Sequence, residues 1–161
     1  MPGRSSLALR AGNVVLDVLP PRAATVAWRV FQTSHVSLFR ATRGRVGAKL
    51  GGVRILLLHH VGRRSGQERV SPLLYVEDGG KLAIIASKGG HPKHPAWFHN
   101  LMAQPDTEVE LGSERRQVRA RVADGEERER IWDKAVASWP DYDRYQARTE
   151  RRIPVVVLDR R

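Results

Sequence analysis

The chain of 161 residues contains no cysteine. This absence excludes both a disulfide framework and a thiol nucleophile, so any redox chemistry has to depend on a bound cofactor. The chain also lacks an apolar run of the roughly 20 residues that would cross a bilayer, since its longest candidates are residues 53–61 and 155–158. Charged residues interrupt the apolar stretches near the N-terminus, so we expect no signal peptide. We therefore expect a soluble or peripheral protein of the cytoplasm, with the inner face of the cell membrane as a second location.

The signatures of several enzyme classes are missing as well. Neither a Ser-centred elbow nor a carboxylate pair points to a hydrolase. No glycine-rich fingerprint follows a first strand, which argues against a Rossmann domain. The histidines lack the spacing of recurrent zinc sites, and no paired acidic residue completes a ligand set, so we expect no metal site. Five of the six histidines lie within residues 59–99, namely His59, His60, His91, His94 and His99.

Acidic residues are scarce in the first part of the chain. Of the net charge of +11, almost all belongs to residues 1–70, which carry 12 Lys and Arg against only Asp17 and Glu68. Such asymmetry indicates an anionic partner, which could be nucleic acid, an acidic membrane surface or a small polyanion. No recognised nucleic-acid module is present, so we do not expect a nucleic-acid partner.

The N-terminal part carries an amphipathic pattern. Large apolar residues fall at helical spacing within residues 25–42, with Arg29 and Arg40 at the flanks, and predict a helix. Its apolar face could pack on the domain or lie in a membrane interface, and both alternatives stay open. We expect residues 1–45 to form a helical extension and residues 46–161 to form one domain. The apolar residues are Trp28, Phe31, Leu38 and Phe39.

From residue 53 onward the chain consists of short β-prone runs separated by turn residues. We expect a helix that starts at Pro95 and ends before Pro105, and a second that is capped by Asp124 with Glu127 and ends before Pro140. Strands at hairpin spacing without βαβ alternation predict an α+β fold, a mostly antiparallel barrel with peripheral helices. The expected strands cover residues 53–61, 67–77 with an irregularity at Pro72, 81–87, 107–111, 117–123 and 153–159.

Two basic loops could bind an anion. The turn at residues 62–69 gathers Arg63, Arg64 and Arg69, whose guanidinium groups match phosphate and carboxylate oxygens. In residues 86–100 a strand ends in Ser-Lys-Gly-Gly, and a basic loop then leads to a helix N-terminus with unpaired N–H groups. The plain alternatives are a solvated basic hairpin and an ordinary strand-loop-helix connection.

A third pattern repeats aromatic residues every three positions. Trp139, Tyr142 and Tyr145 could line one side of a helix and face a flat ring system. Core packing is the alternative explanation for such a stripe.

Taken together, these segments resemble the deazaflavin-dependent nitroreductase family of actinobacterial redox proteins, which bind coenzyme F420 in a split β-barrel. The resemblance covers residues 43–159 in order, which is more specific than any single motif. The matching segments are residues 56–58, 62–69, 72–75, 86–90, 95–101, 104–106, 142–149 and 153–157.

The resemblance implies a split-barrel enzyme that transfers a hydride from reduced F420 to a conjugated acceptor such as a quinone or a nitroaromatic. It implies that Leu74, Tyr75, Trp139, Tyr142 and Tyr145 line the acceptor site, and that Tyr142, Tyr145 and Ser87 are the catalytic residues. Trp139 stands where nitroimidazole-reducing relatives have tyrosine. The implied cofactor-binding residues are Gly62, Arg63, Arg64, Ser65, Gln67, Arg69, Pro72, Ala86, Ser87, Lys88, Gly89, Gly90, Pro95, Ala96 and Trp97.

Two other functions remain as alternatives. One is a related split barrel that binds FMN, although FMN lacks the glutamate tail of F420 and three arginines in one turn favour the longer anion. The other is a basic protein without catalytic activity that binds anions or membranes through the first 70 residues. The sequence does not predict the oligomeric state.

Overall fold

The computed structural model describes residues 34, 36–37, 39–42, 49–50 and 53–161. Its helices are η1 (Lys88–Gly90), α3 (Ala96–Ala103), α4 (Gly125–Ser138) and α5 (Asp141–Ala147). Residues 34, 36–37 and 39–41 are also helical. The strands are β1 (Lys49–Leu50), β2 (Val53–Val61), β3 (Glu68–Asp78), β4 (Lys81–Ile85), β5 (Asp106–Leu111), β6 (Glu114–Val122) and β7 (Val155–Arg160).

The strands form a closed antiparallel barrel. Their order is β1-β2-β3-β4-β7-β6-β5, and β2 also pairs with β5 at Leu57↔Glu110 and Leu58↔Val109, which closes β2 to β7 into a ring. This arrangement confirms the predicted α+β barrel and its six strands. The sequence did not predict β1, because two residues in a glycine-rich connector carry no strand pattern.

The closed ring is split along part of its length, because β3 and β4 pair over only part of β3. The two strands pair at Tyr75–Asp78 with Lys81–Ile84, and beyond this point, within the part of the chain that the structure describes, residues 68–74 pair with β2 alone. Pro72 lies in this edge and pairs with Leu57, and β3 runs through it without interruption, so the expected irregularity is wrong. A strand accommodates proline at an edge because no second neighbour needs its missing N–H group.

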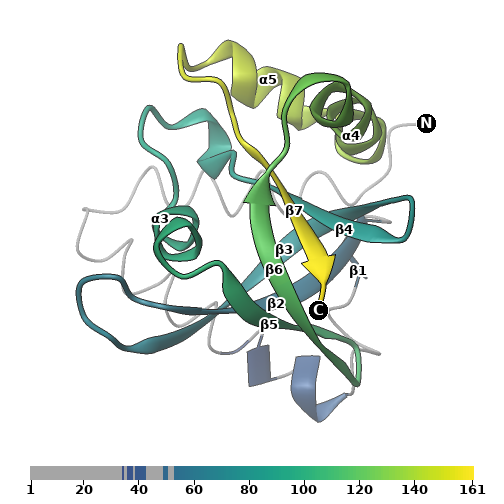
Figure 1. Ribbon diagram of the computed structural model, residues 1–161. Helices are drawn as coiled ribbons and strands as arrows, with labels where there is room; N and C mark the ends of the chain where they lie inside the picture. Colours follow the sequence, from purple (N-terminus) through teal and green to yellow (C-terminus); the bar gives the residue numbers. More distant parts are fainter. Residues whose placement is uncertain (1–33, 35, 38, 43–48, 51–52) are drawn as a thin grey trace.

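Two apolar clusters lie on the two faces of the barrel wall, because side chains alternate along each strand. Leu82 and Ile84 of β4 point into the first cluster inside the barrel, whereas Ala83 and Ile85 point into the second cluster beneath α4 and α5. In Figure 1, α4 and α5 cover the upper end of the barrel, and α3 lies at its left side.

The N-terminal helix is described only at its C-terminal end, and residues 25–33 of the predicted helix lie outside the described residues. Phe39 is fully buried, and the Arg40 guanidinium donates to the carboxylate of Glu110 on β5 at 2.5 and 3.2 Å. This end of the helix is thus packed on the barrel. Among the described residues, no helix is long and apolar enough to span a bilayer.

The expected capping box at the start of α4 is wrong in part. Asp124 occupies the N-cap position, but its side chain makes no cap hydrogen bond. Glu127 instead accepts two hydrogen bonds from Arg121 at 2.6 and 2.8 Å. A bidentate pair with a guanidinium is stronger than the contact of a carboxylate with a backbone N–H group. Glu127 therefore binds Arg121 and does not cap the helix.

Candidate functional site

The turn between β2 and β3 presents three arginines to solvent. The Gly62 N–H group donates to the Gln67 carbonyl at 2.8 Å, and the Gly66 N–H group donates to the Gly62 carbonyl at 2.7 Å, which closes the turn. Arg63, Arg64 and Arg69 are exposed, and no carboxylate within the described residues pairs with them. The turn therefore holds three guanidinium groups whose charges are left for another partner.

A buried hydrogen-bond chain fixes this turn to α3. The Arg63 N–H group donates to Asn100 Oδ1 at 3.1 Å, so the Asn100 amide nitrogen is free to donate to His60 Nδ1 at 2.9 Å. The proton of the neutral His60 ring is then on Nε2, which donates to Ser71 Oγ at 3.0 Å. Burial lowers the pKa of His60 to about 4, and the charges of Arg69 and His59 add to this shift. The sequence did not predict this chain, which depends on contacts 37 and 40 residues apart.

The loop after β4 offers backbone donors. Ser87 has right-handed helical angles (φ −72°, ψ −44°), and the two residues that follow, Lys88 and Gly89, have φ values of 47° and 62°. When a right-handed residue is followed by left-handed ones, successive N–H groups converge on one concave side that suits an anion. The N–H groups of Ser87, Lys88 and Gly89 have no acceptor within the described chain. Lys88 is the sole described non-glycine residue with positive φ, and such conformations often occur at functional sites.

Gly90 serves a different contact from the one that the sequence suggested. A Cβ atom at this position would lie 2.5 Å from the Tyr145 carbonyl oxygen, and Gly90 is buried. The absence of a side chain thus lets η1 pack against α5. The predicted contact of Gly90 with a cofactor stays a prediction.

Helix α3 begins beside this loop. Pro95 is its buried N-cap, Ala96 is exposed, and the first turn contains no acidic residue. Free N–H groups and the positive end of the helix dipole make this end favourable for an anion. Trp97 is 8% exposed and belongs to the first apolar cluster, so its ring contributes mainly to packing.

The aromatic stripe is divided between two elements. Trp139 terminates α4, whereas Tyr142 and Tyr145 lie on α5 with ring centroids 6.1 Å apart. Tyr142 is 6% exposed, packs on Trp132 and has its pKa raised by burial. These facts favour the packing alternative for Tyr142, whereas Trp139 and Tyr145 are half-buried and accessible from outside.

The two β3 residues predicted at the acceptor site face opposite ways. Leu74 packs on the second cluster, which also holds Trp139, Tyr142 and Tyr145. Tyr75 packs on the first cluster inside the barrel. Because neighbouring residues of a strand point to opposite faces, one flat acceptor cannot contact both from the same side. The structure therefore groups Leu74, and not Tyr75, with the aromatic residues.

Unpaired cations gather in three segments, residues 62–69, 86–97 and 148–151, which we call the opening segments. Contacts of Arg151 with Ser87 and His94, and of Asn100 with Arg63, link these segments to one another through α3. Elsewhere in the described chain, Arg160 is the one cation with a described side chain that lacks a carboxylate within 4 Å. The unpaired cations are Arg63, Arg64, Arg69, Lys88, Lys93, Arg148 and Arg151.

The chain is similar to several known proteins. A family model described as F420H(2)-dependent quinone reductase matches residues 31–160. An F420H(2)-dependent quinone reductase of Mycobacterium tuberculosis is 41% identical over 131 residues, which cover 79% of this chain and 88% of the relative. The solved structure of an F420-H2 dependent reductase is 44% identical, has a TM-score of 0.60 and covers 65% of this chain and 93% of its own. A structure described as a domain-swapped dimer is 38% identical, has a TM-score of 0.64 and covers 84% of this chain and 99% of its own.

Proposed function

The chain belongs to the family of F420H(2)-dependent quinone reductases, and from this premise we propose that it transfers a hydride from reduced coenzyme F420 to a quinone. The resemblance to deazaflavin-dependent reductases drawn from the sequence motifs is confirmed. The protein is therefore an oxidoreductase whose cofactor is F420.

The observation that carries the proposal is the gathering of unpaired cations in the opening segments. A polyanion with a phosphate and a glutamate tail needs several cationic donors that are not already paired with carboxylates. Arg63, Arg64 and Arg69 supply such donors at the turn, and Lys88 supplies one at the loop. The free N–H groups of Ser87, Lys88 and Gly89 suit a phosphate oxygen. The donor set thus fits the cofactor.

We assign the turn arginines to the phosphate and the glutamate tail, the Ser87–Gly89 amides to the phosphate and ring region, and the start of α3 to the phosphate. When bound, reduced F420 supplies the hydride at its ring carbon. The protein orients the acceptor against that carbon and limits the access of water.

A quinone that accepts a hydride also takes up a proton to become a hydroquinone. We propose that the proton comes from the hydroxyl of Tyr145, which packs against the second cluster, or from the hydroxyl of Ser87. Tyr142 is less suited, because burial raises its pKa and its ring lies in the second cluster. Its T-shaped contact with Tyr145 would instead orient the Tyr145 ring.

Two finer features remain proposals. Reduction of nitroaromatics is one, since the family description names quinones. Peripheral binding to the inner face of the membrane is the other. It would depend on residues 25–33, because the described end of that helix already buries Phe39 in the protein.

The proposed function is tested by parallel fluorescence titrations with F420 and FMN, followed by steady-state oxidation of reduced F420 with a naphthoquinone. We expect binding of F420 in the micromolar range or tighter, clearly weaker binding of FMN, and turnover that depends on the quinone. Equal affinity for the two cofactors, or oxidation of reduced F420 at the same rate without the protein, would contradict the proposal.

A further inference from the structure

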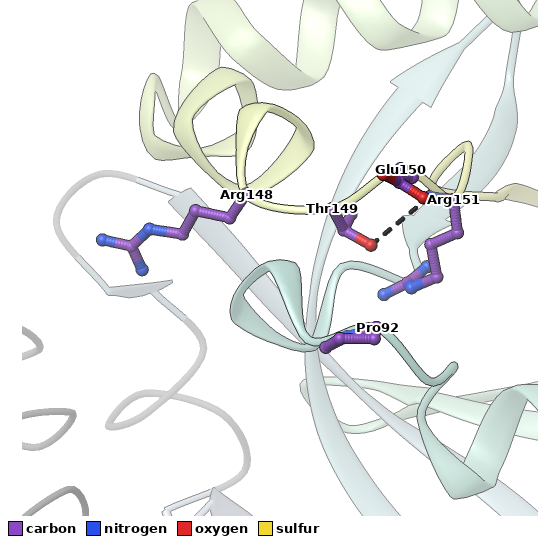
Figure 2. A pocket seen from close by; sticks show the side chains of 5 residues that line it. All are labelled: Pro92, Arg148, Thr149, Glu150 and Arg151. Carbon is purple, nitrogen blue, oxygen red and sulfur yellow. Dashed lines mark hydrogen bonds between the residues drawn. The ribbon is translucent and has the colours of Figure 1, made fainter.

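Arg151, which follows α5, holds the loop that contains Ser87 and Lys88. Its Nε group donates to the His91 carbonyl at 2.8 Å, and its Nη2 group donates to the carbonyls of Ala86 and Ser87 at 3.1 and 2.7 Å. Its Nη1 group lies 3.1 Å from His94 Nδ1. Figure 2 shows Arg151 in the pocket that it lines with Pro92, Arg148, Thr149 and Glu150. One guanidinium therefore spans the loop from residue 86 to residue 94.

All four acceptors of Arg151 are neutral. The other partly buried arginines that contact the barrel pair with carboxylates, as Arg121 does with Glu127 and Asp159. Arg151 has no carboxylate within 4 Å among the described residues, and burial lowers its pKa. Since a half-buried guanidinium without a counter-ion costs free energy, the contacts of Arg151 serve the geometry of the loop and leave a positive charge behind it.

The orientation of the loop peptides follows from these contacts. In a planar trans peptide the C=O and N–H groups point in opposite directions. When the carbonyls of Ala86 and Ser87 turn toward Arg151, the N–H groups of Ser87 and Lys88 turn away from it. These are two of the three amides that have no acceptor in the described chain.

We propose that Arg151 is a positioning residue that holds the Ser87 and Lys88 amides in the orientation that receives an anionic group of the cofactor. This inference rests on the proposed function, since it takes F420 as the ligand of those amides. It also links the segment that follows α5, the helix whose tyrosines are expected at the acceptor site, to the loop that binds the cofactor.

Lysine cannot replace arginine in this role. The guanidinium reaches four acceptors because its N–H groups point in different directions within one plane. An ammonium group on a flexible chain reaches one or two of them. The variant Arg151→Lys therefore keeps the charge and removes the geometry. Arg152→Lys is a matched control, because the neighbouring Arg152 is exposed and pairs with Glu129.

The first measurement needs no cofactor. Hydrogen exchange of the free protein should be faster in residues 86–94 of Arg151→Lys than of the native chain, because the Gly90 and His91 amides lose a fixed acceptor geometry. Exchange in Arg152→Lys should match the native chain. Unchanged exchange in Arg151→Lys would overturn the inference.

The second measurement is a fluorescence titration of each folded variant with F420. We expect roughly tenfold weaker binding for Arg151→Lys, which corresponds to the removal of one charge-assisted hydrogen bond from the complex, with kcat at saturating cofactor close to native. If the native chain binds F420 and Arg151→Lys binds it with the same affinity, the inference is wrong, but the proposed function is not contradicted. No binding by the native protein would sink the proposed function. If Arg151→Lys and Arg151→Gln both unfold, the role of Arg151 is general stability and the inference is wrong.

Discussion

The opening segments and strand β6 are both rich in arginine, but of these two regions only β6 has its arginines paired with carboxylates. Arg115, Arg119 and Arg121 on β6 each contact a carboxylate at 3.0 Å or less. Arg63, Arg64 and Arg69 of the opening contact none among the described residues. Unpaired like charges repel one another and destabilise the folded state. Their concentration on one side is therefore better explained by a ligand than by the fold.

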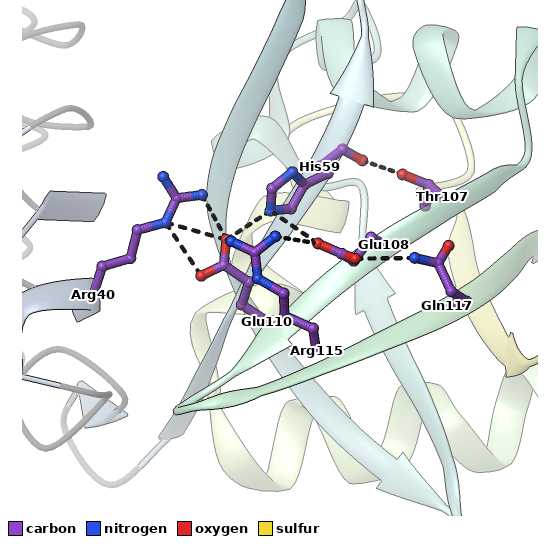
Figure 3. Close-up of polar contacts among 7 residues, drawn as sticks. All are labelled: Arg40, His59, Thr107, Glu108, Glu110, Arg115 and Gln117. Atoms are coloured by element: carbon purple, nitrogen blue, oxygen red, sulfur yellow. Dashed lines mark hydrogen bonds and ion pairs between the residues drawn. The ribbon is translucent and has the colours of Figure 1, made fainter.

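Elsewhere on the barrel, buried carboxylates attach helices to the strands. Glu110 on β5 is 5% exposed and accepts hydrogen bonds from Arg40 and from His59, the latter at 2.6 Å (Figure 3). Burial alone would raise the pKa of Glu110, but the hydrogen bonds from Arg40 and His59 lower it overall. Asp78 pairs with Arg130 and Lys134 of α4 at 2.8 and 2.6 Å in the same manner. These paired charges contribute to the structure.

The largest expected effect separates these two roles of arginine. The triple substitution of Arg63, Arg64 and Arg69 by alanine should weaken F420 binding on the order of a thousandfold, because it removes three charge-assisted hydrogen-bond donors from the complex. The melting temperature should change little, since these side chains are exposed. Titration by fluorescence and a thermal melt measure the two quantities.

The matched control is the triple substitution of Arg115, Arg116 and Arg119 by alanine. It removes the same charge from exposed ion pairs, each of which contributes about 0 to 1 kcal/mol. We expect near-native affinity for F420 in this variant. If both triple variants bound F420 equally weakly, long-range charge alone would attract the cofactor, and the contrast between the turn arginines and the β6 arginines would be wrong.

A smaller effect should appear in the pH dependence of stability. The pKa of His60 is about 4 in the folded chain against an ordinary value of 6.5, so between these values the unfolded chain binds a proton that the folded chain does not. Stability should therefore fall by about 2 kcal/mol as the pH decreases from 7 to 4.5. His60→Gln can accept from Asn100 and donate to Ser71 but does not titrate, so its unfolding free energy should fall less over this range.

Urea unfolding at several pH values measures this difference. His94, whose pKa burial also lowers, contributes with the same sign in both proteins and cancels in the comparison. Parallel pH profiles for the native chain and His60→Gln would show that His60 is not the titrating group.

The strands could be predicted from the sequence because their signals are local. Residues 53–61 combine apolar runs with a Gly-rich turn, and β2 covers these residues. The cation-rich turn was also visible, since Arg63, Arg64 and Arg69 lie within seven positions. Arg151 could not be found in this way, because its acceptors lie 57 to 65 residues away and no pattern marks a guanidinium that binds carbonyl groups. The prediction that the three aromatic residues lie on one helix is wrong, because Pro140 separates Trp139 at the end of α4 from Tyr142 on α5.

The smallest expected effect concerns the aromatic residues, where packing and acceptor binding compete. If Trp139 and Tyr145 only fill the second cluster, conservative substitutions should lower activity toward all acceptors in parallel with the folded fraction. If they line the acceptor site, Trp139→Tyr should leave the melting temperature and F420 affinity nearly unchanged and should shift kcat/KM a few-fold toward a nitroimidazole relative to a quinone, since only transition-state contacts separate substrates.

Tyr142→Phe is the internal reference for this comparison, because Tyr142 is 6% exposed and packs in the second cluster against the Trp132 ring. Removal of its hydroxyl should affect both acceptors equally. Tyr145→Phe, at a half-buried position, should slow the reduction of the quinone at saturating reduced F420 if its hydroxyl donates the proton, and the deficit should shrink as the pH decreases and solvent supplies the proton. Steady-state rates with one quinone and one nitroimidazole for the three variants measure both effects. Equal decreases on both acceptors for Trp139→Tyr and Tyr145→Phe, following thermal stability, would assign these residues to packing alone and leave the acceptor site bounded by the loop at Ser87.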